Sequence, residues 1–569
     1  RTPEVKKFVA WDYVVFAALF LVCASIGVFF AVKERKKKTS KEFLVGGKQM
    51  TCGPIAFSLT SSFMSAVTVL GTPSEVYRYG ASFVLFFLSY ALVIIFTAEL
   101  FLPVFYRSGI TSTYEVTLSL SIHIHFFCFH ELFLLQILYT GIVVYAPSLA
   151  LNQVTGFDLW GSVVATGIVC TFYCTLGGLK AVVWTDAFQM LVMVAGFVTV
   201  LIRGTTLNGG STKVWEDAYE GSRLNIFDFD IDPLRRHTFW TIVIGGTFTW
   251  LGLYGVNQST IQRCISCKSE KHAKLALYLN LLGLWTVLVC AVFCGLVMYS
   301  HYKSCDPWTA DFISAPDQLM PYFVMDIFSS MPGVPGLFVA CAFSGTLSTV
   351  AASINALATV TFEDLVKKGF PNLSEKMSTW ISKGLCILYG VLCTSMAAAA
   401  SLLGGVVQAS LSIHGMCGGP MLGLFTLGIV FPCANWKGAI GGLLAGITLA
   451  FWAGTGSFIY PAPPTKSIPL QLSTLNCTLV NSTEALTTAA STASPDRPFL
   501  ADTWYSLSYL YFSAIGCLGC AVTGLLISFI TGWCSVQSNE HLVRHTQERV
   551  ASSNPAPHTS CSEAPKAHT

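Results

Sequence analysis

One apolar stretch of the chain contains a dense run of hydroxyl side chains, residues 344–349, which read SGTLST. Hard cations such as sodium prefer oxygen ligands. The adjacent hydroxyls of Ser348 and Thr349 could therefore bind sodium together with oxygens of a neighbouring helix. The alternative is that these hydroxyls bond back to carbonyls one turn earlier in their own helix. The density of hydroxyl groups favours the cation site.

Two other segments mix hydroxyl, small and aromatic residues in a way that favours an interrupted helix. Residues 58–66 read SLTSSFMSA, and residues 245–252 read GGTFTWLG. At membrane depth, irregular backbone occurs only where it lines a cavity or is buried in protein. Interrupted helices at corresponding positions of two halves are typical of transporters built on inverted repeats. The alternative is that the small residues only allow close helix packing.

A carboxylate, Asp186, lies in a further apolar run, directly after Trp184 and Thr185. Ionisable groups at membrane depth are costly and usually functional, so Asp186 could support a nearby cation. The alternative is a carboxylate that stabilises a helix N-terminus. His414 also lies in an apolar run. A proton relay is conceivable there because histidine titrates near neutral pH, but a neutral, hydrogen-bonded packing role is the simpler interpretation.

These residues must be positioned by membrane helices. Of all residues 53% are hydrophobic and only 11% are charged, and the mean hydropathy is +0.61. Soluble domains carry about 25% charged residues. We therefore expect an all-α polytopic membrane protein of about thirteen helices. The expected helices span residues 11–32, 53–75, 82–106, 131–151, 158–177, 182–203, 239–258, 275–300, 335–361, 383–403, 406–431, 438–460 and 504–531.

The distribution of basic residues predicts the orientation of these helices, because cytoplasmic loops are rich in Lys and Arg. The first expected helix is followed by residues 33–38, which read KERKKK. That loop is expected inside, so the N-terminus is outside and, after thirteen crossings, the C-terminus is inside. Arg263 and Lys268 are then expected in a cytoplasmic loop. The long loops 204–238 and 461–503 are expected outside.

The loop 461–503 is rich in Ser, Thr, Pro and Ala and contains two glycosylation sequons, at Asn476 and Asn481. We expect both to be glycosylated. We expect residues 1–532 to form the transmembrane transporter domain. The polar segment 533–569 is expected to be a disordered cytoplasmic tail.

The 20 cysteines are scattered through apolar runs and do not suggest a disulfide framework. A zinc site needs four converging ligands, and the pairs Cys264/Cys267 and Cys517/Cys520 do not suggest one. Cys305 and Cys477 fall in expected outside loops, where a disulfide that involves either is conceivable. The formal charge of +3 is too small to suggest nucleic-acid binding, and no phosphate-binding loop indicates coupling to ATP.

Several long segments resemble the sodium/solute symporter family, and within it most closely the sodium-coupled monocarboxylate transporters. The resemblance covers nearly the whole chain. It is carried by residues 11–16 (WDYVVF), 63–71 (FMSAVTVLG), 254–258 (YGVNQ), 314–318 (SAPDQ) and 344–355 (SGTLSTVAASIN). The resemblance implies the five-plus-five inverted repeat of the leucine-transporter type, with core repeats at about residues 53–203 and 239–431.

The same resemblance implies a sodium site between the second and ninth helices, with sodium as the only metal and no transition metal. Hydroxyl ligands would come from Ser348 and Thr349, and Asp186 would support them, with Gln189 one turn on. The first interrupted helix would contribute Ser61, Ser62 and Met64, with Ser61 and Met64 acting through backbone carbonyls.

A substrate cavity would be lined, by the same resemblance, by Phe63, Thr68, Trp250, Tyr254 and Gln258. Iodide-transporting members of the family carry a glutamine at the position of Thr68. A hydroxyl there favours a carboxylate as the transported anion. The groups that hold the carboxylate are left open.

The chain departs from the family pattern at residues 116–135, which begin VTLSLSIHIH. This stretch puts the start of the fourth expected helix in doubt. It also contains His123 and His125, with His130 close by. These histidines invite a metal-site interpretation, which the anomalous context disfavours.

The resemblance implies that the chain is not an enzyme. It implies sodium-coupled symport of short-chain monocarboxylates, such as lactate, pyruvate, nicotinate and short-chain fatty acids, by alternating access. The plasma membrane, and the apical membrane of epithelial cells, would be its location. Expected partners are sodium, the monocarboxylate and the lipid bilayer, with no cofactor. An iodide or vitamin transporter of the same family, or an anion channel, is the alternative. Oligomeric state and sodium stoichiometry stay open.

Overall fold

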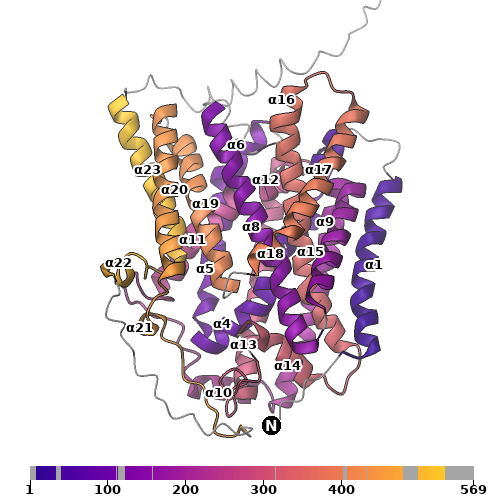
Figure 1. The fold of residues 1–569 in the computed structure, drawn as a ribbon, viewed down its shortest axis with the longest axis vertical. Helices are drawn as coiled ribbons and strands as arrows, with labels where there is room; N and C mark the ends of the chain where they lie inside the picture. The colour runs from indigo at the N-terminus through magenta and orange to yellow at the C-terminus, as the bar shows by residue number, and fades with distance from the viewer. Residues whose placement is uncertain are drawn as a thin grey trace, which may run out of the picture.

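The computed structural model describes residues 8–33, 40–109, 112, 122–156, 158–313, 316–401, 406–431, 433–477 and 498–531. The described residues form helices and connecting segments without a named strand, and one isolated bridge joins Met50 to Cys267. The helices run roughly parallel along the long axis of the molecule (Figure 1). An all-α polytopic protein, as expected, is confirmed.

Nine helices among the described residues are long and apolar enough to cross a membrane, or ten if one bent pair counts as a single span. The nine are α1 (Ala10–Lys33), the run from η3 to α6 (Ala81–Arg107), α9 (Leu159–Leu207), α13 (Glu270–Tyr302), α15 (Val334–Thr361) with its extension to Gly369, α17 (Glu375–Ser395) with α18 (Ala397–Ala400), α19 (Val406–Val430), α20 (Trp436–Ile459) and α23 (Phe512–Thr531) with η8 (Tyr509–Tyr511).

Several shorter elements form parts of these spans, and others connect or cap them. They are α2 (Ser40–Val45), η1 (Gly46–Lys48), η3 (Ala81–Leu85), α5 (Phe86–Phe96), η4 (Thr97–Phe101), α6 (Leu102–Arg107), α10 (Ser211–Glu220), η6 (Pro316–Gln318), α14 (Leu319–Ile327), η7 (Phe362–Val366), α16 (Lys367–Gly369), α21 (Pro464–Ser467) and α22 (Phe499–Asp502).

The second expected helix is interrupted, as its hydroxyl-rich sequence predicts. α3 (Cys52–Phe63) ends at Met64, and a helix resumes through η2 (Val67–Gly71) and α4 (Thr72–Tyr79). The two halves are bent by 57°. Met64 has φ −86° and ψ 72°, which is not helical, so the last carbonyls of α3 lack their usual partners.

The corresponding helix of the second repeat is interrupted too, but the predicted position is wrong: residues 245–252 are helical, and the break follows Gly255. η5 (Thr241–Gly245) and α11 (Gly246–Gly255) end before Asn257, whose side chain accepts a hydrogen bond from the Ser259 amide and so begins α12 (Gln258–Ile265). Two broken helices at corresponding positions are the expected signature of an inverted repeat.

α9 contains two of the expected spans in one 49-residue element, which turns at Gly178. Gly178 has a φ of +61°. A Cβ atom there would lie 2.4 Å from the Phe43 carbonyl oxygen, so only glycine suits this bend. With α8 (Ile122–Thr155), the bent pair and η5–α11, the helices match the thirteen expected segments, although α8 begins earlier than expected.

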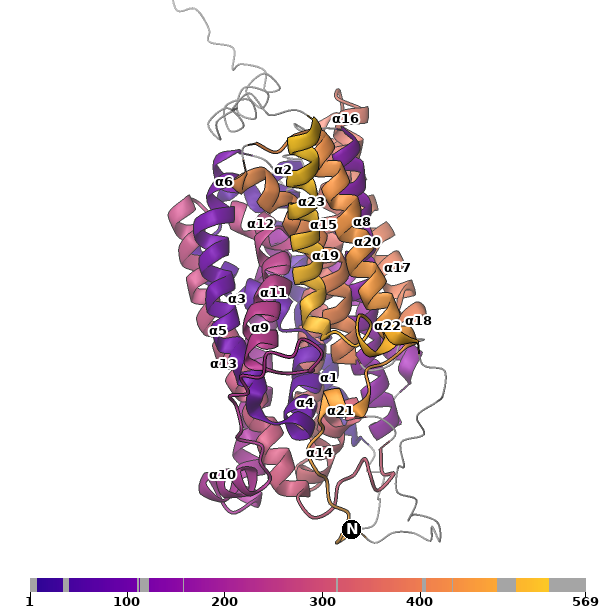
Figure 2. The ribbon, with the colours of Figure 1, turned by 90° about the vertical axis from the view of Figure 1, so that its left-hand side faces the viewer.

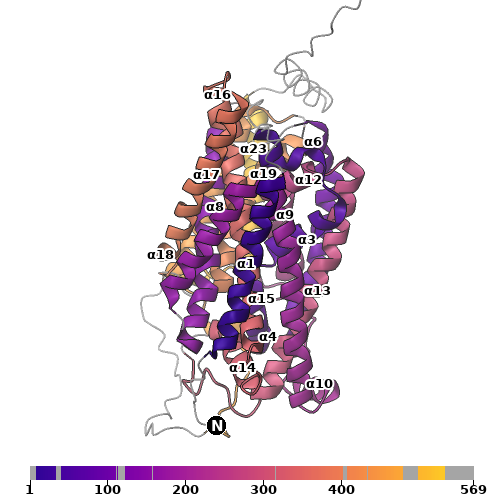
Figure 3. The same cartoon turned by 90° about the vertical axis from the view of Figure 1, so that its right-hand side faces the viewer.

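α15 is the central helix of the bundle. In its most apolar stretch 94% of the residues are buried, whereas in that of α1 only 22% are. α1 lies at one edge of the bundle, and α20 and α23 lie at the opposite edge (Figure 1). Views from the two sides show α23 foremost at one edge and α1 at the other (Figures 2 and 3). The site described below surrounds α15.

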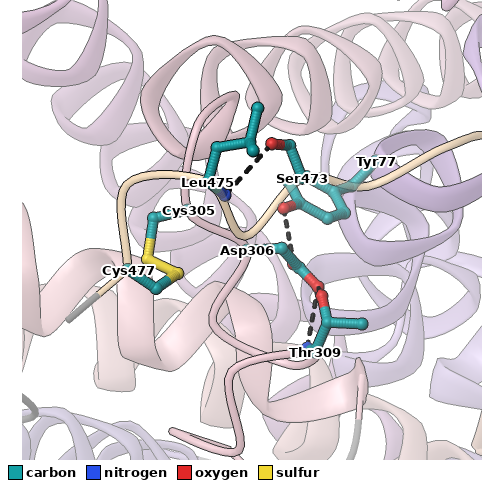
Figure 4. The surroundings of a disulfide bond; sticks show 7 residues. All are labelled: Tyr77, Cys305, Asp306, Thr309, Ser473, Leu475 and Cys477. Carbon is teal, nitrogen blue, oxygen red and sulfur yellow. Dashed lines mark hydrogen bonds between the residues drawn. A yellow bond between two sulfur atoms is a disulfide. The ribbon is translucent and has the colours of Figure 1, made fainter. Parts of the chain in front are cut away.

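A segment that we call the strap, residues 461–477, covers one end of the bundle. The amide of Leu470, in the strap, donates to the Arg78 carbonyl at the end of α4. Cys477, at the end of the strap, forms a disulfide with Cys305, just beyond α13. Beside this disulfide, the Tyr77 hydroxyl donates to the Asp306 carboxylate at 2.6 Å (Figure 4). The strap thereby joins α4, the second half of the broken helix, to the end of α13.

Candidate ion and substrate site

Asp186 lies in the middle of α9 and is completely buried. The Ser58 hydroxyl donates to its Oδ2 at 2.6 Å, and the Ser62 hydroxyl donates to the same oxygen at 3.2 Å. Both serines come from α3. The sequence placed Ser62 and Asp186 near each other only through the family resemblance, and the structure brings them into direct contact.

The hydroxyl run of α15 faces the same point. The Ser348 and Ser62 hydroxyl oxygens lie 3.0 Å apart. The Thr349 hydroxyl lies 2.8 Å from the Ser62 carbonyl oxygen and 2.9 Å from the Gly345 carbonyl oxygen, so it can donate to either. A Cβ atom on Gly345 would lie 2.9 Å from the Ala66 nitrogen. Glycine therefore lets α15 approach the break in the first helix.

The site has more oxygen acceptors than the described residues satisfy. Ser61 Oγ, Asp186 Oδ1 and Gln189 Oε1 are buried without a hydrogen-bond partner in the described part of the chain. Buried polar groups are normally paired, and each exception needs an explanation. Neutral and anionic oxygens of this kind suit a hard cation. Four of the predicted residues, Ser62, Asp186, Ser348 and Thr349, are thus brought together in an oxygen-rich cluster. No hydrogen bond in the described part of the chain joins Ser61, Met64 or Gln189 to this cluster.

Arg263 was missed as a site residue. It was expected in a cytoplasmic loop, and this expectation is wrong, because only 1% of Arg263 is exposed. Its guanidinium donates to Ser62 Oγ at 2.7 Å and to Asp186 Oδ2 at 3.2 Å. The break between α11 and α12 returns this residue to the core. The positive charge balances Asp186, so the ion cluster has no net fixed charge from this pair.

A small cavity lies beside the ion cluster, at the break between α3 and α4. It leaves about 40 Å³ for the centres of water-sized groups, and a single water needs about 10–15 Å³ on this measure. The space therefore suits a ligand of a few heavy atoms. The lining residues are Phe63, Ser65, Val67, Thr68, Thr72, Phe83, Phe86, Tyr90, Tyr139, Trp250, Leu253, Ser410, Leu411 and His414.

No Asp, Glu, Lys or Arg lines this cavity among the described residues. Its polar groups are hydroxyls, one imidazole and the indole of Trp250, whose buried Nε1–H has no partner in the same part of the chain. The helix that runs from Ala66 to Tyr79 begins at the cavity wall with Val67 and Thr68. The N-terminus of a helix carries partial positive charge, so the wall favours an anion without a formal cation.

Three of the five predicted substrate residues, Phe63, Thr68 and Trp250, line the cavity. The other two do not. Tyr254 lies behind Phe63, with ring centroids 4.5 Å apart, and its hydroxyl accepts a hydrogen bond from Asn280 at 3.3 Å. Gln258 begins α12 and is not among the lining residues.

Other sequence features fall outside the site. Asn476 is exposed on the strap, and Asn481 lies outside the described residues. The side chains of His123, His125 and His130 also lie outside the described residues. Cys264 of α12 and Cys267, just beyond it, are buried free thiols.

Comparisons with known proteins agree with this architecture. The profile of the Sodium:solute symporter family matches residues 43–446. Sodium-coupled monocarboxylate transporter 2 from Homo sapiens is 73% identical over 93% of this chain and 85% of its own length. The protein of that name from Danio rerio is 66% identical over the same shares. The human sodium/iodide cotransporter is 47% identical over 94% of this chain and 85% of its own length.

Solved structures agree on the fold. A Na+-coupled sialic acid symporter in a substrate-bound outward-open state covers 93% of this chain and 100% of its own, with a TM-score of 0.75 and 20% identity. The nucleobase-cation-symport-1 transporter MHP1 in a closed conformation covers 89% of this chain and 98% of its own, with a TM-score of 0.52 and 12% identity. The inverted-repeat core of the leucine-transporter type is thus confirmed.

Proposed function

Because the chain belongs to the sodium:solute symporter family, as its family profile and its relatives establish, we propose that it carries short-chain monocarboxylates across the plasma membrane together with sodium. The observation that supports this best is the pairing of two neighbouring sites. One is an oxygen-rich ion cluster with buried acceptors that lack partners, and the other is a cavity without a charged lining residue, where the Trp250 indole is an unpaired donor among the described residues. Relatives over 93% of the chain are named as sodium-coupled monocarboxylate transporters.

Sodium binds at the ion cluster between α3, α9 and α15. Ser348 and Thr349 supply hydroxyl oxygens, and the break after α3 supplies carbonyl oxygens at Ser61 and Met64. Ser62, Asp186 and Gln189 support these ligands through hydrogen bonds and through the negative charge of Asp186. Two buried side-chain oxygens that lack partners among the described residues, Asp186 Oδ1 and Gln189 Oε1, support this assignment. Sodium would give these oxygens the partner that they lack.

The monocarboxylate binds in the adjacent cavity, against Phe63, Thr68 and Trp250. Its carboxylate gains the Trp250 Nε1–H and the positive end of the helix that begins at Ala66. The described cavity lining holds no fixed cation, so the carboxylate would be held more strongly when sodium occupies the neighbouring cluster. That difference in affinity is the coupling that symport requires.

Alternating access moves the two sites from one side to the other. The broken helices, α3–α4 and α11–α12, line both sites and can change their exposure when one group of helices rocks against the rest. Tyr254 and Gln258, which do not line the cavity in this conformation, lie on the second broken helix and its continuation. We place them on the path by which the substrate leaves the cavity.

The N-terminus lies outside and the C-terminus inside in the orientation that we propose. The strap then faces an oxidising compartment, which agrees with the disulfide between Cys305 and Cys477. Asn476 is exposed and accessible to glycosylation in this orientation. Treatment with a glycosidase should shift the electrophoretic mobility of the unaltered protein. A smaller shift in Asn476→Gln supports this orientation. An unchanged shift contradicts glycosylation at Asn476.

Radiolabelled L-lactate uptake into proteoliposomes tests the function. An inward tenfold sodium gradient supplies about 1.4 kcal/mol per ion, so uptake should transiently exceed equilibrium, whereas an equal potassium gradient should give no such excess. Ser348→Ala should weaken the sodium effect. Ser344→Ala is the matched control, because Ser344 bonds back to the Ala340 carbonyl within α15. Equal uptake with both cations contradicts the proposal.

An iodide carrier is the second candidate, since the human sodium/iodide cotransporter is 47% identical to the chain. Competition in the same proteoliposomes separates the two. Nicotinate and propionate should reduce lactate uptake, and iodide should not. Inhibition by iodide alone favours the iodide carrier.

A further inference from the structure

Among the described lining residues of the central cavity, His414 is the one imidazole, on a wall otherwise made of hydroxyl, indole and apolar groups. His414 lies on α19, lines the cavity and is only 3% exposed. Its Nδ1 lies 3.1 Å from the Ser410 carbonyl oxygen, four residues earlier in the helix. A carbonyl oxygen only accepts, so Nδ1 must carry the proton.

The other ring nitrogen, Nε2, therefore carries a lone pair as long as the ring is neutral. Within the described chain, Nε2 makes no hydrogen bond, and the ring's close neighbour is Tyr139, which packs edge-on with centroids 4.0 Å apart. No acidic residue of the described lining could balance an imidazolium. A buried charge without a partner is unfavourable, so the cavity holds a neutral ring with an unused acceptor.

The chemistry of this acceptor selects among small acids. A carboxylate or a keto oxygen brings a lone pair towards Nε2 and is repelled. A hydroxyl group brings a proton and forms a hydrogen bond. We propose that His414 recognises the 2-hydroxyl group of a 2-hydroxy monocarboxylate, with Nε2 as the acceptor. This rests on the monocarboxylate transport proposed above and makes His414 a specificity residue for it.

Two acids of similar size test the proposal, L-lactate and propionate, which differ only in the 2-hydroxyl group. Their half-saturation constants for sodium-driven uptake are measured in one preparation for each variant. His414→Phe removes the acceptor and keeps a ring. His414→Gln keeps an amide oxygen near the place of Nε2. Met416→Leu is the matched control, because Met416 faces Gly454 of α20 and does not line the cavity.

The loss of one neutral hydrogen bond corresponds to about a three- to tenfold weaker affinity. His414→Phe should therefore raise the half-saturation constant for lactate about three- to tenfold and leave that for propionate within about twofold. His414→Gln and Met416→Leu should keep the preference for lactate. An equal change for both acids, or no change for lactate, overturns the role of His414. If the unaltered protein takes up neither acid with sodium, the proposed function fails first, and this inference falls with it.

Discussion

The guanidinium of Arg236 donates to the Glu75 carboxylate at 2.8 Å, with only 12% and 11% of the two side chains exposed. The same guanidinium donates to Gln408 Oε1 at 2.7 Å. Glu75 belongs to α4, the second half of the first broken helix, and Gln408 belongs to α19. One arginine thus connects two helices that line the substrate cavity, at the end of the bundle that carries the strap.

Removal of either partner of this pair should destabilise the protein strongly, because it leaves a nearly buried charge without its counterion. The expected cost is about 3–5 kcal/mol for Arg236→Gln or Glu75→Gln. The double variant should cost clearly less than the two single costs added together. Thermal unfolding in detergent measures all three. Additive costs would show that the two side chains act independently.

Thr349 should act through its hydroxyl group. Thr349→Val keeps the shape of the side chain and removes the oxygen that lies 2.8 Å from the Ser62 carbonyl. We expect Thr349→Val to raise the half-saturation constant for sodium by about tenfold or more, since charge-assisted contacts are worth about 1.5–3 kcal/mol. Thr349→Ser should stay close to the unaltered protein. Similar sodium dependence in both variants would exclude Thr349 as a ligand.

Asp186 and Arg263 should behave as a coupled pair. Asp186→Asn leaves the Arg263 guanidinium buried without its carboxylate, so it should weaken sodium dependence and lower thermal stability. Arg263→Met removes the charge with little change in volume. The double variant should recover stability relative to Asp186→Asn, while its sodium dependence stays weak. Recovery of both properties would make Asp186 a structural residue only.

The disulfide between Cys305 and Cys477 should stabilise the protein. It closes a loop between cysteines 172 residues apart. Cys305→Ser, Cys477→Ser and the double variant should each lower the free energy of unfolding by about 2–4 kcal/mol. The double variant should match the singles. Mild reduction of the unaltered protein should give the same shift in thermal unfolding, and reduction should leave the double variant unchanged.

The ion pair between Asp217 of α10 and Lys303 beyond α13, 2.9 Å apart, predicts a pH dependence. Burial raises the pKa of Asp217, but hydrogen bonds from Ser300 and Lys303 outweigh this effect, so the pKa is lowered overall. Hydrogen bonds to Glu220 and Asp217 raise the pKa of Lys303. The stability that Asp217 contributes is fully present at pH values above the usual aspartate pKa of about 3.9. The stability that Lys303 contributes is fully present at pH values below the usual lysine pKa of about 10.4.

The stability difference between the unaltered protein and Asp217→Asn should therefore be constant from about pH 5 to 9, because both groups keep their charges there. It should shrink as the pH falls through the lowered pKa of Asp217 or rises through the raised pKa of Lys303. Thermal unfolding across this range measures it. A difference that changes steadily between pH 6 and 8 would indicate another titrating group.

The sequence predicts the helices well because length and hydropathy are local properties. It also predicts the interruption near residues 58–66 from the density of hydroxyl and small residues. The position of Arg263 could not be predicted, since a bend at Gly255 and Asn257 decides whether the residue faces solvent or the core. The exposure of His414 to the cavity depends likewise on the rotation of α19 against α8 and α11, which no local pattern encodes.

The pairing of Asp186 with Arg263 has an electrical consequence. Together they contribute no net charge, and no charged side chain of the described lining faces the cavity. One elementary charge moved through 100 mV is worth about 2.3 kcal/mol. The step that returns the empty carrier would therefore move no charge from these groups through the field. The voltage sensitivity that arises at these two sites would then come from the cargo, and would report how many sodium ions accompany each anion.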